Sequence, residues 1–357
     1  MRSSPEIASQ VARATMDFTK LSQEQILAFG EPCPEFEEAL RTYKRHDFDW
    51  SDPTKVLATI RHMVGLMDQS DQKDPEVIEE VVEATARDGT SLPIKVLRSA
   101  TNRSLDRPLI VLYFPGGMVL GSNTSMAPLA RLLIKKFDVV VALPTYRVAP
   151  EHPFPTSFDD GWDTFSWIAE NAVSTLRADP KKGFVVGGIS SGGNISNVIA
   201  HLARDKALQP PITGVWLSCA GVRLAPQDAD KLPKEYSERL SSRTQDSCIN
   251  NVISSPEMAK LFQTSLKADE NSHIFAPLTW PTGHANLPKT YAQICGMDGI
   301  RDESLVFDDM LKKQGVATRL DLYEGLPHTF WHQFKDLPQA KKWQKDTIEG
   351  FEWLLDV

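Results

Sequence analysis

Short runs of apolar, β-branched residues alternate with segments of helical periodicity from residue 109 to near the C-terminus. Runs this short and this uniformly apolar indicate strands that are buried on both faces. Strands that alternate with helices predict a mostly parallel sheet with helices on both sides, and active sites of such sheets gather at the carboxyl ends of the strands. The runs are 109–114, 139–143, 184–186, 212–219, 291–295 and 318–323.

Three other parts of the chain complete the predicted organisation. Residues 81–86 and 94–97 read as two further strands joined by the turn Asp88-Gly89. Residues 1–75 are charged and amphipathic, which predicts an N-terminal helical segment before a core that spans 76–357. Residues 222–286 interrupt the alternation, so we expect a cap insertion over the active site; a plain surface insertion is the alternative.

Charge and cysteine usage exclude several classes of protein. The 357 residues carry a formal net charge of −8, which argues against a nucleic-acid partner because such a partner requires a basic face. The four cysteines form no CxxC pair, and reduced thiols fit an intracellular protein. No signal peptide or membrane-spanning apolar run is apparent. We therefore expect a cytoplasmic location; the oligomeric state stays open, with a homodimer among the allowed assemblies.

The pattern G-x-S-x-G occurs at residues 188–192, directly after an apolar run and before a helical pattern. In this context it is typical of a serine nucleophile on a sharp turn from strand to helix. Small neighbours let the backbone pack closely, and the helix N-terminus favours negative charge that develops near Ser190. We predict that Ser190 is a nucleophile; the alternative is a glycine-rich packing turn. A dinucleotide or phosphate loop fits less well, because G-x-G-x-x-G and Gly-Lys-Ser/Thr are absent there.

Two adjacent glycines, Gly116 and Gly117, follow the apolar run 109–114. Backbone N–H groups at glycines can approach an oxygen atom without obstruction by a side chain. A tetrahedral oxyanion needs two or three such donors, each of which lowers the barrier by about 3 kcal/mol. We predict that the N–H groups of Gly116, Gly117 and Ser191 form an oxyanion hole; an ordinary tight turn is the alternative.

A serine nucleophile needs a general base and an acid that orients the base. His328 directly follows the last predicted strand, and Asp298 follows the strand before it, so both belong to the same sheet edge. We predict His328 as the base, with an ordinary pKa of about 6.5, and Asp298 as the acid. Asp302 and Glu303 compete for the acid's role, but they read as first-turn acids of the next helix.

Four blocks of the sequence, in this order, resemble the hormone-sensitive-lipase group of α/β-hydrolases, which includes plant carboxylesterases. They are 113–122, the block Y-R-V-A-P-E-H-P-F-P at 146–155, the elbow 188–193, and 298–303 with Pro327-His328. The resemblance covers residue 78 to the C-terminus. It implies an α/β-hydrolase fold: a mostly parallel eight-stranded sheet flanked by helices, with a helical cap to which residues 1–75 and 222–286 contribute.

The resemblance also implies serine-dependent hydrolysis of a small-molecule carboxylic ester, with no metal and no organic cofactor. It implies that Glu151 supports the nucleophile loop through hydrogen bonds; a surface acid in a proline-rich turn is the alternative. The chain departs from the family at four places. Phe114 stands where the family has His, and Pro115 where it has the first Gly. Beside the nucleophile, Ile189 replaces an Asp and Ser191 replaces an Ala.

Two rival functions use the same scaffold. An eliminase or dehydratase, or another acyl-transfer enzyme, would use the oxyanion hole for a different reaction, and eliminase relatives often lack the serine. A ligand-binding receptor, as in the plant hormone receptor that resembles this family, has lost the catalytic histidine. Because Ser190 and His328 are both present, the sequence favours ester hydrolysis over these alternatives.

Overall fold

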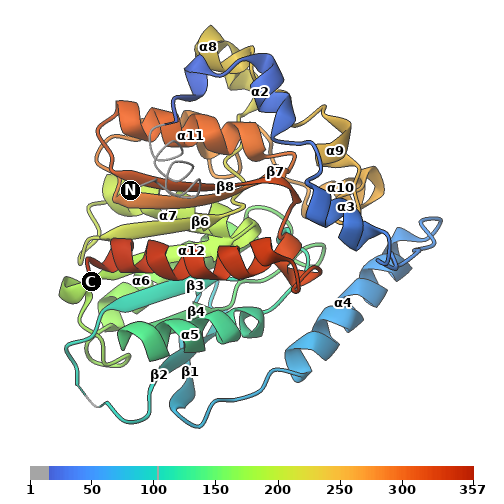
Figure 1. Ribbon diagram of the computed structural model, residues 1–357. Coiled ribbons are helices and arrows are strands. Elements are labelled where there is room, and N and C mark those ends of the chain that lie inside the picture. Colours follow the sequence, from blue (N-terminus) through green and yellow to red (C-terminus); the bar gives the residue numbers. More distant parts are fainter. Residues whose placement is uncertain (1–15, 103) are drawn as a thin grey trace, which may run out of the picture.

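The computed structural model describes residues 16–102 and 104–357 and contains one sheet in the order β1-β2-β4-β3-β5-β6-β7-β8 (Figure 1). All eight predicted strands are confirmed. Only β2 runs against the others, because it pairs antiparallel with both β1 and β4. The strands are β1 Val77–Thr85, β2 Ser91–Ser99, β3 Leu109–Tyr113, β4 Val140–Pro144, β5 Phe184–Ile189, β6 Gly214–Ser218, β7 Lys289–Met297 and β8 Thr318–Pro327.

The strand ends differ from the prediction where a strand is polar on one face. β1 begins at Val77 rather than at residue 81, because Glu79 and Glu80 pair with β2 although they break the apolar run. This is an edge strand with an exposed face, so its sequence need not be continuously apolar. The central strands β3, β4, β5 and β6 are buried along their whole length, as their uniform apolar runs predicted.

Helices cover both faces of the sheet. In Figure 1, α5 and α12 lie in front of the sheet, whereas α6 and α7 lie behind it. Helix α11 packs against β7 and β8. The helices of this core are α5 Ala127–Phe137, α6 Thr156–Asn171, α7 Ser191–Asp205, α11 Arg301–Lys313 and α12 Pro338–Leu355, with short 3₁₀ helices η2 Asn123–Met126, η3 Pro180–Lys182 and η6 Phe330–His332.

The N-terminal segment and the 222–286 insertion are both helical and contact each other. Arg239 Nε donates to the carbonyl oxygen of Leu21 at 3.3 Å, and Gln245 Nε2 donates to that of Leu27 at 2.8 Å. Residues 1–15 of the predicted N-terminal segment lie outside the described residues. The elements are η1 Phe18–Lys20, α2 Gln23–Ala28, α3 Pro34–Leu40 and α4 Pro53–Gln69, then η4 Pro226–Lys231, α8 Lys234–Ser237, α9 Asp246–Ile249, α10 Pro256–Leu266 and η5 Pro277–Thr279.

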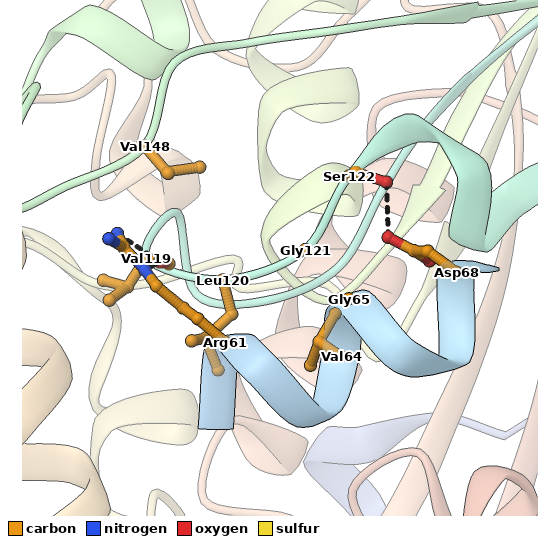
Figure 2. Close-up of a pocket in the computed structure, with 9 residues that line it drawn as sticks. All are labelled: Arg61, Val64, Gly65, Asp68, Val119, Leu120, Gly121, Ser122 and Val148. Carbon is orange, nitrogen blue, oxygen red and sulfur yellow. Dashed lines mark hydrogen bonds between the residues drawn. The ribbon is translucent and has the colours of Figure 1, made fainter. Parts of the chain in front are cut away.

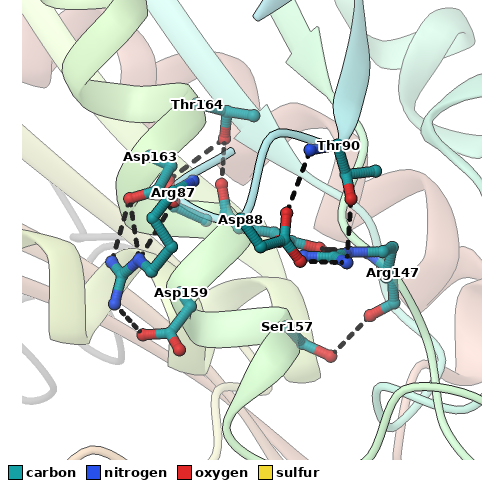
Figure 3. A network of polar contacts seen from close by, with 10 residues as sticks. Arg87, Asp88, Thr90, Arg147, Ser157, Asp159, Asp163 and Thr164 are labelled. Atoms are coloured by element: carbon teal, nitrogen blue, oxygen red, sulfur yellow. Dashed lines mark hydrogen bonds and ion pairs between the residues drawn. The ribbon is translucent and has the colours of Figure 1, made fainter. Parts of the chain in front are cut away.

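Ion pairs fasten the β1–β2 turn to helix α6 (Figure 3). Arg147 lies 2.7 Å from the buried carboxylate of Asp160 and 2.7 Å from that of Asp88. Arg87 pairs with Asp159 and Asp163 of the same helix. Because Arg147 belongs to the 146–155 block, these pairs fix the path of that block where it leaves β4.

Within residues 16–102 and 104–357, no helix combines the length and the apolar character that a membrane crossing requires. The cytoplasmic location inferred from the cysteines stays a prediction.

Two helical glycines offer a matched test of how tightly α12 packs on the sheet. A Cβ at Gly350 would lie 1.9 Å from the ring of Tyr291, whereas a Cβ at Gly65 of α4 would meet nothing within 4 Å. Tyr291 cannot move aside freely, since it is fully buried and its hydroxyl donates to Asp321 at 2.9 Å. We expect Gly350→Ala to lower the free energy of unfolding by about 1–2 kcal/mol, because overpacking outweighs the gain in helix propensity.

The control, Gly65→Ala, should raise the free energy of unfolding by up to about 1 kcal/mol. Urea unfolding followed by circular dichroism measures both variants. If both substitutions changed the free energy of unfolding equally, the result would contradict the packing that the structure gives to α12.

Candidate active site

Ser190 lies on a strained turn between β5 and α7. Its backbone has φ 54° and ψ −119°, a region that residues with a side chain rarely adopt. The turn requires glycine on both sides: a Cβ on Gly192 would lie 2.1 Å from the carbonyl oxygen of Tyr113, and a Cβ on Gly188 would lie 2.4 Å from the carbonyl carbon of Gly192. The Ser190 N–H donates to the carbonyl of Ser218 at 2.8 Å. Backbone packing therefore holds the serine at the carboxyl edge of the sheet.

The structure brings Ser190, His328 and Asp298 together in a hydrogen-bonded row. Nε2 of His328 lies 2.9 Å from Oγ of Ser190, and Nδ1 lies 2.5 Å from Oδ2 of Asp298. Asp298 directly follows β7 and His328 directly follows β8, so neighbouring strands position the two side chains. Asp298 is buried, whereas the His328 side chain is 22% exposed. The imidazole is therefore partly accessible, whereas its acid is not.

The environment shifts the pKa of His328 upward. Burial alone lowers the pKa of the imidazole, but the negative charge and hydrogen bond of Asp298 outweigh burial and raise the pKa to about 9. The positive charge of Arg223 acts in the opposite direction. The value differs from the ordinary 6.5 expected from sequence, because the contact with a buried carboxylate cannot be read from residue types.

The two competing acids have other partners. Asp302 accepts hydrogen bonds from the backbone N–H groups of Ser241 and Ser242, each at 2.7 Å. Glu303 accepts one from the N–H of Leu224 at 2.6 Å. Both acids lie in the first turn of α11, as expected. Their carboxylates therefore fasten the insertion to the core and leave the imidazole to Asp298.

Two other histidines form a buried pair away from this row. Nε2 of His201 lies 2.9 Å from Nδ1 of His284, and the outer ring nitrogens lie 2.8 Å from the carbonyl oxygen of Asn197 and 3.0 Å from that of Leu278. Burial lowers the pKa of His201 to about 3 and that of His284 to about 4. The pair links α7 to the segment that leads from the insertion into β7.

The predicted oxyanion donors lie on the loop after β3 and at the start of α7. Gly116 and Gly117 have φ values of 131° and 64° and are partly exposed. Among the described residues, the N–H groups of these two glycines donate to no protein acceptor. Ser191 is the first residue of α7, where N–H groups lack partners within the helix. The described residues therefore leave these N–H groups available as donors.

Phe114, which replaces the family's histidine, is fixed by an aromatic stack. Its ring lies parallel to that of Tyr146, with 3.9 Å between ring centroids. The Tyr146 hydroxyl donates to the carbonyl oxygen of Phe114 at 2.7 Å and lies 3.4 Å from Oγ of Ser191. Tyr146 thus braces the loop against the elbow, a role that the sequence analysis did not assign to it.

Glu151 is linked through Arg61 of α4 to residues 114–122, which we call the oxyanion loop because they include the predicted donors Gly116 and Gly117. Its carboxylate lies 2.7 Å from Nη1 of Arg61. The same guanidinium donates to the carbonyl oxygens of Val119 at 2.9 Å and Ala149 at 2.5 Å. The hydrogen bonds of Glu151 therefore go to α4, whereas the family resemblance implied bonds to the nucleophile loop.

The sequence analysis did not select Arg61, because no local pattern links this residue to Glu151, which lies 90 residues away in the sequence. Figure 2 shows the Arg61 side chain beside a cavity of about 360 Å³ between α4 and the oxyanion loop. Asp68 closes the other end of this cavity and accepts a hydrogen bond from Oγ of Ser122 at 2.6 Å. Helix α4 is thus bonded to the oxyanion loop at two points.

One group of side chains in the described part of the chain has metal-ligating atoms close together. The Cys219 sulfur and the ligand atoms of Asp298 and His328 lie within 4.8 Å of one another. A metal ion bound there would have to replace the hydrogen bond between Asp298 and His328. The group therefore suits a base and its acid better than a resident metal ion.

Two curated proteins resemble this chain over most of its length. An "AB hydrolase superfamily protein" of Schizosaccharomyces pombe is 36% identical over 270 residues, which are 75% of this chain and 77% of the relative. "Carboxylesterase NlhH" of Mycobacterium tuberculosis is 30% identical over 245 residues, which are 68% of this chain and 72% of the relative.

A solved structure and a family model agree with these relatives. The crystal structure of vibralactone cyclase has a TM-score of 0.81 and 28% sequence identity, and the match covers 92% of this chain and 96% of that one. The family model described as "alpha/beta hydrolase fold" matches residues 110–332, a range that contains Ser190, Asp298 and His328. The chain therefore belongs to the alpha/beta-hydrolase fold family, within the hormone-sensitive-lipase-like group that its motifs resemble.

Proposed function

We propose that this protein hydrolyses a carboxylic ester through an acyl-enzyme on Ser190. The observation that carries the proposal is the row of hydrogen bonds from Ser190 Oγ through the imidazole of His328 to Asp298, at 2.9 and 2.5 Å. A serine hydroxyl becomes a nucleophile when a positioned base accepts its proton, and the base works best when a third group holds its tautomer. A relative named carboxylesterase gives independent support.

The reaction has two steps. Ser190 attacks the ester carbonyl while His328 takes the hydroxyl proton, and the oxyanion is stabilised by the N–H groups of Gly116, Gly117 and Ser191. His328 then gives the proton to the leaving alcohol, and the acyl group remains on the serine. Water attacks the acyl-enzyme with the same base and releases the acid.

We further propose that the N-terminal segment from residue 16 and the 222–286 insertion form a cap on the core. They contact each other through Arg239 and Gln245. Phe262 of α10 lies over the oxyanion loop, since a Cβ on Gly117 would lie 2.8 Å from its ring. Such a cap would exclude water from the acyl-enzyme and shape the space for the substrate.

The likeness to vibralactone cyclase favours one second candidate, in which a hydroxyl group of the substrate releases the acyl-enzyme in place of water. The two reactions share every step up to the acyl-enzyme. Hydrolysis in water enriched in ¹⁸O places the label in the released acid, whereas cyclisation releases an unlabelled lactone.

Labelling with a fluorophosphonate tests the nucleophile. We expect one adduct per chain by intact mass in the wild type, and no adduct in Ser190→Ala because the attacking oxygen is removed. Turnover of a short p-nitrophenyl ester should fall at least about 10³-fold in the same variant.

Ser196→Ala is the matched control, because this hydroxyl lies nearly two turns further along the chain in α7 and donates to the carbonyl of Gly192 at 2.8 Å. It should keep the adduct. A folded wild type that forms no adduct and hydrolyses no ester would contradict the proposal.

The pH profile tests the base. Only the neutral imidazole can accept the serine proton, so kcat/KM should rise with pH as His328 loses its proton, with a midpoint near pH 9. Asp298→Asn removes the charge that raises the pKa of His328, so the midpoint should move down toward about 6.5. The plateau should fall by about 10³- to 10⁴-fold, because the tautomer is no longer held.

The exposed histidine His152 provides the control, and His152→Gln should keep the wild-type profile. A midpoint that does not respond to Asp298→Asn would show that another group controls the pH dependence.

A further inference from the structure

Arg223 lies at the carboxyl edge of the sheet, in the segment that follows β6. Its main chain is fixed: the carbonyl oxygen of Arg223 accepts a hydrogen bond from the N–H of Leu278 at 3.0 Å, and the next N–H, that of Leu224, donates to Glu303 at 2.6 Å. The guanidinium carbon lies 5.2 Å from the centre of the Phe275 ring. The side chain is therefore held at a defined place although the residue is only partly buried.

A short series of contacts connects this place to the nucleophile. The carbonyl oxygen of Phe275 accepts a hydrogen bond from Nδ2 of Asn194 at 3.3 Å, and the N–H of Asn194 donates to the carbonyl of Ser190 at 3.0 Å. The positive charge of Arg223 lies close enough to oppose the protonation of His328. Arg223 thus stands on the same side of the sheet as the reacting groups.

In the described part of the chain, the guanidinium of Arg223 lies near the Phe275 ring and has no polar partner. Among the described arginines that are not fully exposed, it alone takes part in no hydrogen bond and no ion pair; Arg61, Arg98, Arg107, Arg131, Arg147, Arg204, Arg239, Arg301 and Arg319 all have partners. A partly buried charge without a partner is unfavourable, so such groups usually have a functional explanation.

The acids near Arg223 are engaged elsewhere. Glu303 pairs with Arg243 at 2.6 Å. Glu270 accepts a hydrogen bond from Gln263 at 3.2 Å, and Asp298 holds the imidazole of His328. Within residues 16–102 and 104–357, no acid therefore occupies the donors of the Arg223 guanidinium, which are available to a ligand.

We propose that Arg223 binds a carboxylate of the substrate, so that the preferred esters carry a negative charge in addition to the ester group. The inference rests on the proposed ester hydrolysis and specifies its substrate class. A guanidinium presents two parallel N–H groups that match a carboxylate, and the nearby Phe275 ring favours the positive charge at this place. The net charge of −8 would otherwise repel such a substrate, so local recognition is needed.

Two pairs of esters of nearly equal size test the proposal. Monomethyl adipate and dimethyl adipate compare a charged and a neutral acyl chain. 4-Acetoxybenzoate and its methyl ester compare a charged and a neutral leaving alcohol. The readout is the ratio of kcat/KM for the charged ester to that for the neutral ester, measured by chromatography of the products.

We expect the wild type to favour the charged ester in one of the two pairs, which also identifies the side of the ester that faces Arg223. Arg223→Gln should reduce that ratio by about 10- to 100-fold. Arg223→Lys should retain part of the preference. The matched control is Lys260→Gln, which removes one positive charge from an exposed position of α10 in the same insertion, and it should keep the wild-type ratio.

A wild type that favours the neutral ester in both pairs, or an equal loss of both rates in Arg223→Gln, would overturn the proposal. If circular dichroism shows that Arg223→Gln does not fold, the ratios of kcat/KM for the wild type and for Arg223→Lys test the proposal instead.

A second readout needs no turnover: adipate, but not its neutral diamide, should slow labelling of Ser190 by a fluorophosphonate. Equal protection by both would also overturn the anion site. The complete absence of a fluorophosphonate adduct would count against the proposed hydrolysis itself.

Discussion

The close approach of two backbone segments is the contact on which the rest of the site depends. The first turn of α7 touches the end of β3 so tightly that only glycine fits at residue 192. This approach accompanies the strained conformation of Ser190 and brings the start of α7 against the residues that lead into the loop after β3. In the proposed mechanism, a single steric requirement thus positions the reacting oxygen and the loop that carries its predicted donors.

The segment 298–303 has two functions that are physically coupled. Asp298 holds the imidazole, whereas Asp302 and Glu303, one helical turn later, accept hydrogen bonds from backbone N–H groups of the insertion. Because these acids share one loop and the start of one helix, a shift of the insertion would move the anchor of the base. In the proposed function, the position of the cap and the orientation of the base are therefore coupled.

Much of the fold could be predicted because its signals are local. Uniform apolar runs identified the six strands from β3 to β8, the turn Asp88-Gly89 joined the two strands before them, and the G-x-S-x-G pattern predicted the elbow from three small residues around Ser190. His328 and Asp298 were selected by their place after two successive strands, and the structure puts them in contact with each other.

Features that arise between distant parts of the chain were not predictable. Nothing near Arg61 or Glu151 indicates that these residues pair, and nothing near Arg223 indicates that its charge lacks a partner. The stack of Phe114 on Tyr146 was missed for the same reason, since the family's histidine at that position suggested a polar brace. These contacts depend on packing of side chains in space, which a single sequence does not encode in any short pattern.

The buried histidine pair has a consequence for protons. Three ring-nitrogen contacts, to Asn197, between His201 and His284, and to Leu278, each need one hydrogen atom. Two neutral imidazoles supply only two, and burial opposes a third by lowering both pKa values. One contact must therefore lack its hydrogen atom at neutral pH. The row of contacts between α7 and the segment before β7 therefore has one hydrogen atom fewer than it has contacts. A change of tautomer moves the missing hydrogen atom from one contact to another.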